Sequence, residues 1–96
     1  MPDCFEDACR QAALELAELV IRKQRDYGHD NINTFGDFGL LVRVNDKVAR
    51  LRNLYGKQAV NESINDSWDD LGGYSIIRKM RQRGTFDLEL KEVKHE

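Results

Sequence analysis

The sequence predicts an all-α fold: a small bundle of three main helices followed by a short extended C-terminal tail. Three observations lead to this prediction. The single proline stands at position 2, so no later residue is a helix-breaking proline. Three segments carry apolar residues at spacings of three and four, which is the period of one helix face. A stretch rich in glycine, asparagine and aspartate, residues 26–39, separates the first two segments, and Gly56 closes the second.

The first helix is expected over about residues 3–25. Asp3 followed by Glu6 has the spacing of a helix-start capping box, with Asp in the Ser/Thr place. The apolar stripe that follows contains Phe5, Cys9, Ala12, Ala13, Leu16, Leu19 and Val20. We expect Cys9 to pack in the core. Cys4 and Cys9 should both be reduced thiols, because a spacing of five on one helix places them on different sides.

A long loop and a second helix come next. Residues 26–39, DYGHDNINTFGDFG, form a loop that is longer than a simple turn requires. Loops of this length often carry function. The second helix is expected over about residues 38–54, and Gly56 closes it.

The third helix begins after a polar cap and ends at a glycine. Asn61 or Ser63 is the candidate cap, and the helix is expected to continue to about residue 83 and to stop at Gly84. The tail that follows alternates apolar and polar residues, with Phe86 and Leu88 among the apolar ones. This alternation predicts a short strand or an extended arm.

Length and charge limit the classes of protein to which this chain can belong. The 96 residues fit one domain, which spans 1–96. Three helices make a thin bundle, so a homo-oligomer, a dimer or larger, is expected to complete it. The net charge of -2 disfavours direct nucleic-acid binding. No apolar run approaches about 18 residues and no signal peptide is evident, so we expect a cytoplasmic protein without a membrane span.

Acidic residues form a line on the third helix. Glu62, Asp66 and Asp69 lie within a narrow sector at about 100° per residue, and Asp70 lies at the edge of that sector. No Lys or Arg occurs from position 58 to position 77, so we expect these carboxylates to be unpaired and to repel one another. A hard cation such as Mg²⁺ would remove the repulsion. The two interpretations are a magnesium site and a solvated acidic face.

The second helix supplies the opposite charge. Its cationic residues over 43–57 are Arg43, Lys47, Arg50, Arg52 and Lys57. Lys47 and Arg50 are candidate phosphate ligands, while Asp46, the one acid of this segment, could join a metal. The alternative is a series of ion pairs within the helix, formed by Arg43, Asp46 and Arg50, which would contribute little to stability.

Glycines and loop residues indicate where a flat ligand could lie. Gly72 and Gly73 each cost about 1 kcal/mol relative to Ala inside a helix, which favours close approach of a ligand or of another helix. Gly73 lies on the carboxylate line and is therefore a candidate ligand contact. The loop also mixes aromatic and amide residues that could stack a base and read its edge. They are Tyr27, Asn31, Phe35 and Phe38. The alternative is that the loop aromatics pack down onto the bundle.

Three motifs together carry a resemblance to a known family. They are K-x-x-D-Y-G from Lys23 to Gly28, G-L-L-V-R-V-N-D-K-V-A-R-L-R-N-L over 39–54, and E-S-I-N-D-S-W-D-D-L-G-G-Y over 62–74. The chain resembles the phage and bacterial nucleotide modification associated domain 1 family, most strongly over residues 20–80. That family is in turn similar to the all-α nucleotide pyrophosphatases of the MazG and dimeric dUTPase group.

The resemblance implies a helical nucleotide-binding fold that uses Mg²⁺ held by acids on two helices. The candidate metal ligands are Asp46, Glu62, Asp66 and Asp70. The candidate nucleotide or phosphate contacts are Lys23, Tyr27, Asn31, Arg43, Lys47, Arg50 and Gly73. The chain also departs from the MazG-like pattern, because Ser67 stands where a Glu would be and Asp46 stands in for a motif of three acids.

Two classes of function follow from these residues. The first is an Mg²⁺-dependent enzyme, a hydrolase that converts a (deoxy)nucleoside triphosphate to monophosphate and pyrophosphate. The second is a non-catalytic phage protein in the host cytoplasm that binds or sequesters a nucleotide or a cyclic signal nucleotide, with a role in DNA modification or against host defence. A helical protein-interaction module is a third interpretation.

Overall fold

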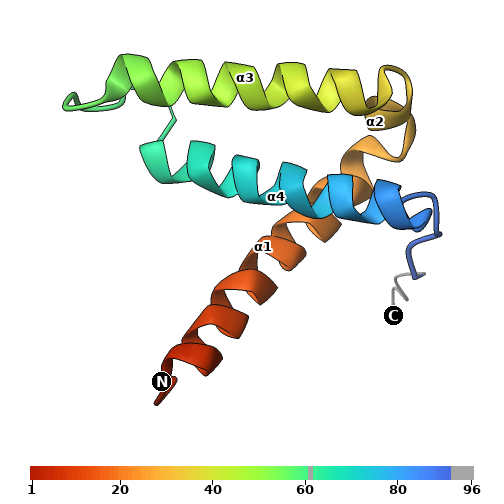
Figure 1. Ribbon diagram of the computed structural model, residues 1–96, viewed down its shortest axis with the longest axis horizontal. Coiled ribbons are helices and arrows are strands. Elements are labelled where there is room, and N and C mark those ends of the chain that lie inside the picture. Colours follow the sequence, from red (N-terminus) through yellow and green to blue (C-terminus); the bar gives the residue numbers. More distant parts are fainter. Residues whose placement is uncertain (61, 92–96) are drawn as a thin grey trace, which may run out of the picture.

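The computed structural model describes residues 1–60 and 62–91, and this part of the chain forms four helices and no strand. The helices are α1 (Phe5–Tyr27), α2 (Asp30–Asn33), α3 (Gly36–Leu54) and α4 (Ile64–Arg83). Helices α3 and α4 run side by side in opposite directions, and α1 crosses α4 at an angle so that its N-terminal half projects away from the pair (Figure 1). The all-α prediction with three long helices is confirmed.

Helix α1 differs from its expected bounds at both ends. Cys4 is the N-cap residue and makes no side-chain hydrogen bond to the helix, so the predicted capping box at Asp3 is wrong. The helix continues through Tyr27 because the first residue with a left-handed backbone is Gly28, at φ +70°. The amide of Gly28 donates to the Gln24 carbonyl at 2.8 Å, which closes the last turn.

The predicted loop over 26–39 contains helical structure. One turn of helix, α2, lies within it, and α3 begins at Gly36, two residues before its expected start. Ile32 of α2 is buried, and the amide of the Asn33 side chain donates to the Asp87 carboxylate at 2.7 Å. Burial of one apolar side chain and a bond to the C-terminal segment therefore order a segment whose composition favours a loop.

Both ends of α4 agree with the sequence prediction. The Ser63 hydroxyl accepts a hydrogen bond from the Asp66 amide at 3.0 Å, as an N-cap residue does. Gly84 ends the helix in the left-handed conformation at φ +71°. The alternative cap, Asn61, lies outside the described residues.

The core is small and lies near one end of the molecule. Within the described residues, the buried hydrophobic side chains are Ile32, Leu40 and Phe86. Phe86 belongs to the C-terminal segment, which over residues 84–91 packs onto the helices as an irregular segment without a strand. Cys9 is exposed, so its expected place in the core is wrong. Because α1 crosses α4 instead of running along it, the half of α1 that carries Cys9 reaches no neighbouring helix (Figure 1).

None of the helices in residues 1–60 and 62–91 combines the length and the apolar character that a membrane span requires.

The packing of α1 on α4 depends on small residues at the point where the two helices cross. A Cβ atom added at Gly72 would lie 2.6 Å from Leu16 Cδ1, whereas one added at Gly73 would lie 3.4 Å from Val20 Cγ2. Gly72 therefore sets how closely the two helices approach.

We expect Gly72→Ala to lower the free energy of unfolding by about 1 kcal/mol. Alanine gains about 1 kcal/mol in helix propensity, but the new methyl group must displace the Leu16 side chain, and overpacking of this kind costs about 1–3 kcal/mol. Gly73→Ala is the matched control, since its methyl group meets ordinary van der Waals contact and should leave stability unchanged or raised. Urea denaturation of both variants checks this. Equal stability of the two variants would contradict the packing role of Gly72.

Candidate functional site

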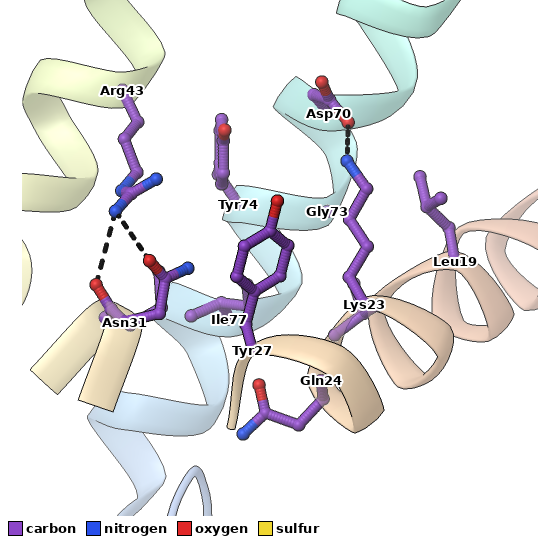
Figure 2. A pocket seen from close by; sticks show the side chains of 12 residues that line it. Leu19, Lys23, Gln24, Tyr27, Asn31, Arg43, Asp70, Gly73, Tyr74 and Ile77 are labelled. Atoms are coloured by element: carbon purple, nitrogen blue, oxygen red, sulfur yellow. Dashed lines mark hydrogen bonds and ion pairs between the residues drawn. The ribbon is translucent and has the colours of Figure 1, made fainter. Parts of the chain in front are cut away.

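A pocket of about 130 Å³ lies where the C-terminal half of α1 meets α2, α3 and α4 (Figure 2). Six residues that the sequence singled out line this pocket: Lys23, Tyr27, Asn31, Arg43, Asp70 and Gly73. They come from all four helices. The structure thus brings most of the predicted contact residues to one place.

Helix geometry positions Lys23 and Tyr27, and a side-chain contact positions Arg43. Lys23 and Tyr27 are one turn apart on α1, so both face the pocket. Arg43 of α3 reaches across to α2, where its Nη2 donates to Asn31 Oδ1 at 3.1 Å and to the Asn31 carbonyl at 3.3 Å. A guanidinium has five N–H donors, and these two bonds use only one of its nitrogens. Arg43 therefore holds α2 in place and still presents donors to the pocket.

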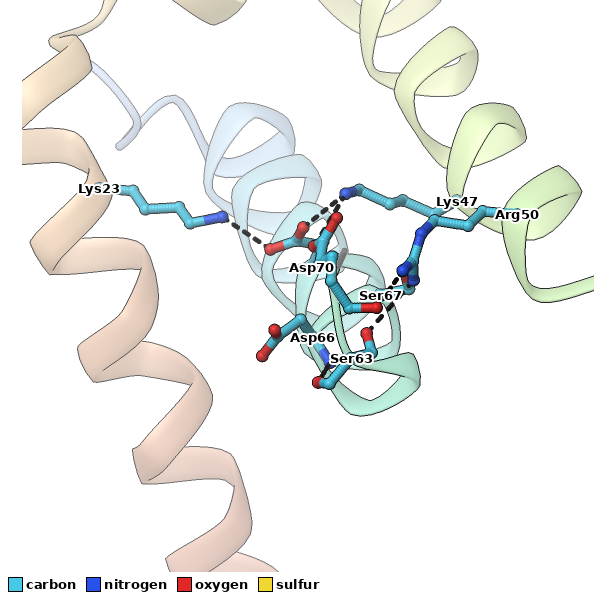
Figure 3. A network of polar contacts seen from close by, with 8 residues as sticks. Lys23, Lys47, Arg50, Ser63, Asp66, Ser67 and Asp70 are labelled. Atoms are coloured by element: carbon cyan, nitrogen blue, oxygen red, sulfur yellow. Dashed lines mark hydrogen bonds and ion pairs between the residues drawn. The ribbon is translucent and has the colours of Figure 1, made fainter. Parts of the chain in front are cut away.

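Asp70 lies at the inner wall of the pocket between two lysines (Figure 3). Its Oδ1 accepts from Lys23 Nζ of α1 at 2.7 Å, and its Oδ2 accepts from Lys47 Nζ of α3 at 2.8 Å. The Asp70 side chain is 10% exposed, that of Lys47 is 20% exposed and that of Lys23 is 50% exposed. The expectation that Asp70 is unpaired is therefore wrong, because its partners come from two other helices.

These contacts move the pKa values of the buried charges. Desolvation by burial pushes the pKa of Asp70 upward, but the hydrogen bonds and charges of Lys23 and Lys47 outweigh it, so its pKa lies below the ordinary value of 3.8. The hydrogen bond to Asp70 raises the pKa of Lys47 above its ordinary value of 10.5, although burial opposes this. The charged residues that line the pocket are thus Lys23, Arg43 and Asp70, while Lys47 lies behind Asp70 with Glu62 Oε1 at 3.5 Å. The two cations exceed the one carboxylate of the lining, and this excess of positive charge favours an anion.

Arg50, a predicted phosphate contact, instead makes hydrogen bonds to residues at the start of α4. Its Nη1 donates to Ser67 Oγ at 2.7 Å and to the Ser63 carbonyl at 3.2 Å (Figure 3). Its Nη2 donates to the Glu62 carbonyl. Ser67 is fully buried. Arg50 therefore joins α3 to the first turn of α4 and does not line the pocket. Lys47 does not line the pocket either, because it binds Asp70 and lies 3.5 Å from Glu62 Oε1.

The candidate metal ligands do not converge. Asp46 is exposed on α3, and Asp66 is exposed in the first turn of α4, where an acid is favoured by the helix dipole. Glu62 lies beside Lys47, and both Asp70 oxygens accept from lysines. Among residues 1–60 and 62–91, no three His, Cys, Asp or Glu side chains form a group that could hold a metal ion. This arrangement does not fit an Mg²⁺ site made of these four residues.

The pocket also contains an aromatic residue that was not predicted as a contact. Tyr74 of α4 lines it together with Tyr27 of α1, and the two side chains lie on neighbouring sides of the same hollow (Figure 2). Tyr74 follows Asp70 by one helical turn, so the position of Asp70 on the helix was a signal that could have identified it. Two aromatic rings thus stand beside the cationic groups.

Comparison with known protein families, with curated proteins and with solved structures finds no match for this chain.

Proposed function

We propose that this pocket binds a small phosphorylated ligand that carries an aromatic ring, and that a mononucleotide is the class of ligand that fits best. One observation carries the proposal: two tyrosine rings share one hollow with two cations, Lys23 and Arg43, and a single carboxylate. Aromatic side chains stack flat bases. Lysine and arginine donate charge-assisted hydrogen bonds to phosphate oxygens. The resemblance of residues 20–80 to a nucleotide-associated family favours the same class.

Lys23 is the cation best placed to meet the phosphate. It is half-exposed, whereas Lys47 is largely covered and also lies near Glu62. When Lys23 turns from Asp70 to a phosphate oxygen, Asp70 keeps Lys47 as its counter-charge and is not left buried and unpaired. The paired lysines therefore allow Lys23 to exchange partners at low cost.

The placement of the acids favours binding over hydrolysis, and the size of the pocket limits how much of the ligand is enclosed. A cavity that encloses a whole drug-sized ligand has a volume of about 300–1,000 Å³, and this pocket is smaller. One end of a nucleotide would remain in solvent. The carboxylates that a metal-dependent pyrophosphohydrolase needs also stand apart. A binding role without release of pyrophosphate is the function that this geometry supports best.

Loss of the Lys23 ammonium should weaken ligand binding about tenfold, since one charge-assisted hydrogen bond is worth roughly 1.5 kcal/mol. Isothermal titration calorimetry of Lys23→Ala with the common deoxynucleoside monophosphates, and with inorganic phosphate, measures this loss. Arg22→Ala is the matched control, because Arg22 is the neighbouring exposed cation on α1 and does not line the pocket. Wild-type protein that binds none of these ligands, or a Lys23→Ala variant that binds as tightly as wild type, would contradict the proposal.

A further inference from the structure

The chain exposes far more surface than a compact protein of its mass. A folded monomer of 11.1 kDa exposes about 5,700 Å², whereas this chain exposes 7906 Å². Its radius of gyration is 15.3 Å, compared with about 12.5 Å for a compact chain of this length. The surplus is well above the roughly 800 Å² that each partner buries in a standard protein interface. The fold thus has enough uncovered surface for a stable dimer.

Part of this surplus is an apolar groove between α3 and α4, which we call the α3/α4 groove. Its apolar lining includes Leu41, Val48, Leu51 and Tyr55 of α3 and Trp68 and Leu71 of α4. The end nearer Leu41 also holds Asp37 and Arg78, which form an ion pair at 3.2 Å. Two hollows of about 510 and 440 Å³ follow one another along it. At about 100° per residue, Trp68 and Leu71 lie on the side of α4 opposite Gly73, which faces α1. The Trp68 end of the groove is therefore separate from the ligand pocket, whereas Tyr74 lines both the pocket and the Leu41 end of the groove.

The other uncovered feature is the projecting half of α1, residues 5–15. Every residue of this segment is exposed, and the Phe5 side chain is 81% exposed. Phe5, Cys9 and Ala12 lie in line with Leu16, the residue that packs on Gly72, so an apolar ridge continues past the last contact with α4. A helix of this length gains most of its stability from packing of such a face.

We propose that a second copy of this chain covers the α3/α4 groove and that residues 5–15 of its α1 occupy the groove. Shape favours this occupant, because an apolar helix ridge fills a groove, whereas two facing grooves would enclose an empty space. Length agrees as well: residues 5–15 span about 16 Å of helix, and residues 41–55 of the groove span about 22 Å.

Charge complementarity also favours this pairing. The first turn of α1 carries Glu6 and Asp7, and Arg52 lines the groove at the end where Tyr55 and Trp68 lie. Each copy has one ridge and one groove, so a reciprocal exchange uses both surfaces of both copies in a closed two-fold dimer.

The single tryptophan of the chain is a built-in probe of this interface. Trp68 lies in the groove and is 61% exposed in one copy. Docking of the partner should bury its indole ring, so its fluorescence emission should shift to shorter wavelength as the protein concentration rises. The shift should follow the change from monomer to dimer mass in light scattering of the full chain.

Three variants test the two halves of the interface. Val48→Glu places a charge in the groove, and Phe5→Glu places one on the ridge, where an acid in the first turn suits the helix itself. Each should give a monomer with solvent-exposed Trp68 emission. Val42→Glu is the matched control, because Val42 is a similarly exposed residue on α3 that does not line the groove, and it should remain a dimer.

Circular dichroism of each variant confirms that the helices persist, and Leu41→Glu replaces Val48→Glu if helical content falls. A wild-type monomer at tens of micromolar would overturn the proposal. So would a Phe5→Glu variant that stays a dimer with buried Trp68, since another segment would then fill the groove.

Discussion

Asp70→Asn is expected to lower the free energy of unfolding by about 2–3 kcal/mol. The side chain keeps its shape but loses the charge that holds Lys23 and Lys47. Two ammonium groups from different helices then face each other without a counter-charge. Removing one partner of a fully buried ion pair costs about 3–5 kcal/mol, and the partial exposure of Lys23 reduces that cost here. This outcome is the reverse of what unpaired, mutually repelling carboxylates would give.

Chemical denaturation at one fixed protein concentration measures the effect, because dimer formation would make stability depend on concentration. Asp69→Asn is the matched control: Asp69 is the neighbouring residue on α4, is exposed and carries the same charge. Its change should stay within about 0.5 kcal/mol, as for most surface substitutions. If the two variants are equally stable, the lysines do not depend on Asp70.

The pH dependence of this difference has a definite sign. The pKa of Asp70 is lower in the folded chain than its ordinary value of 3.8, so its contribution to stability is present above that value and is lost as the pH falls through the folded pKa. The pKa of Lys47 is raised above 10.5, so its contribution is present below that value and is lost as the pH rises through the folded pKa. The gap between wild type and Asp70→Asn should therefore be constant around neutral pH and should close in acid below about pH 4.

Arg50→Ala is expected to destabilise the fold by about 3 kcal/mol. The change removes the guanidinium that bonds Ser67 Oγ and two carbonyls at the start of α4. Ser67 is fully buried, so its hydroxyl would lose a partner where water does not reach it. Hydrogen bonds to a charged group contribute about 1.5–3 kcal/mol, and a buried polar group left without a partner costs about 1–3 kcal/mol.

A double-mutant cycle with Ser67→Ala tests this account. Ser67→Ala alone should cost about 1 kcal/mol, since Arg50 keeps its bonds to the carbonyls. The double variant should be more stable than the sum of the two single changes predicts, by about 1 kcal/mol or more. Strict additivity of the two changes would show that the contact between Arg50 and Ser67 contributes nothing to stability.

The sequence by itself determined the features of the fold that depend on near neighbours. Apolar spacing located the three long helices, and Ser63 and Gly84 marked the two ends of α4. These predictions succeed because a helical hydrogen bond or cap joins residues only three or four positions apart.

Only the tertiary structure decided which charges meet. Asp70 pairs with Lys23, a residue 47 positions away. Arg50, predicted to bind a phosphate, donates to Ser67 Oγ. Cys9 belongs to an apolar stripe and is still exposed, because α1 crosses α4 and leaves its first half uncovered. The spacing of residues along one helix fixes which side chains share a face. The partners of each charge depend on the crossing angle of the helices and on the long side chains that reach that face from other helices. The spacing of residues along one helix carries no information about either.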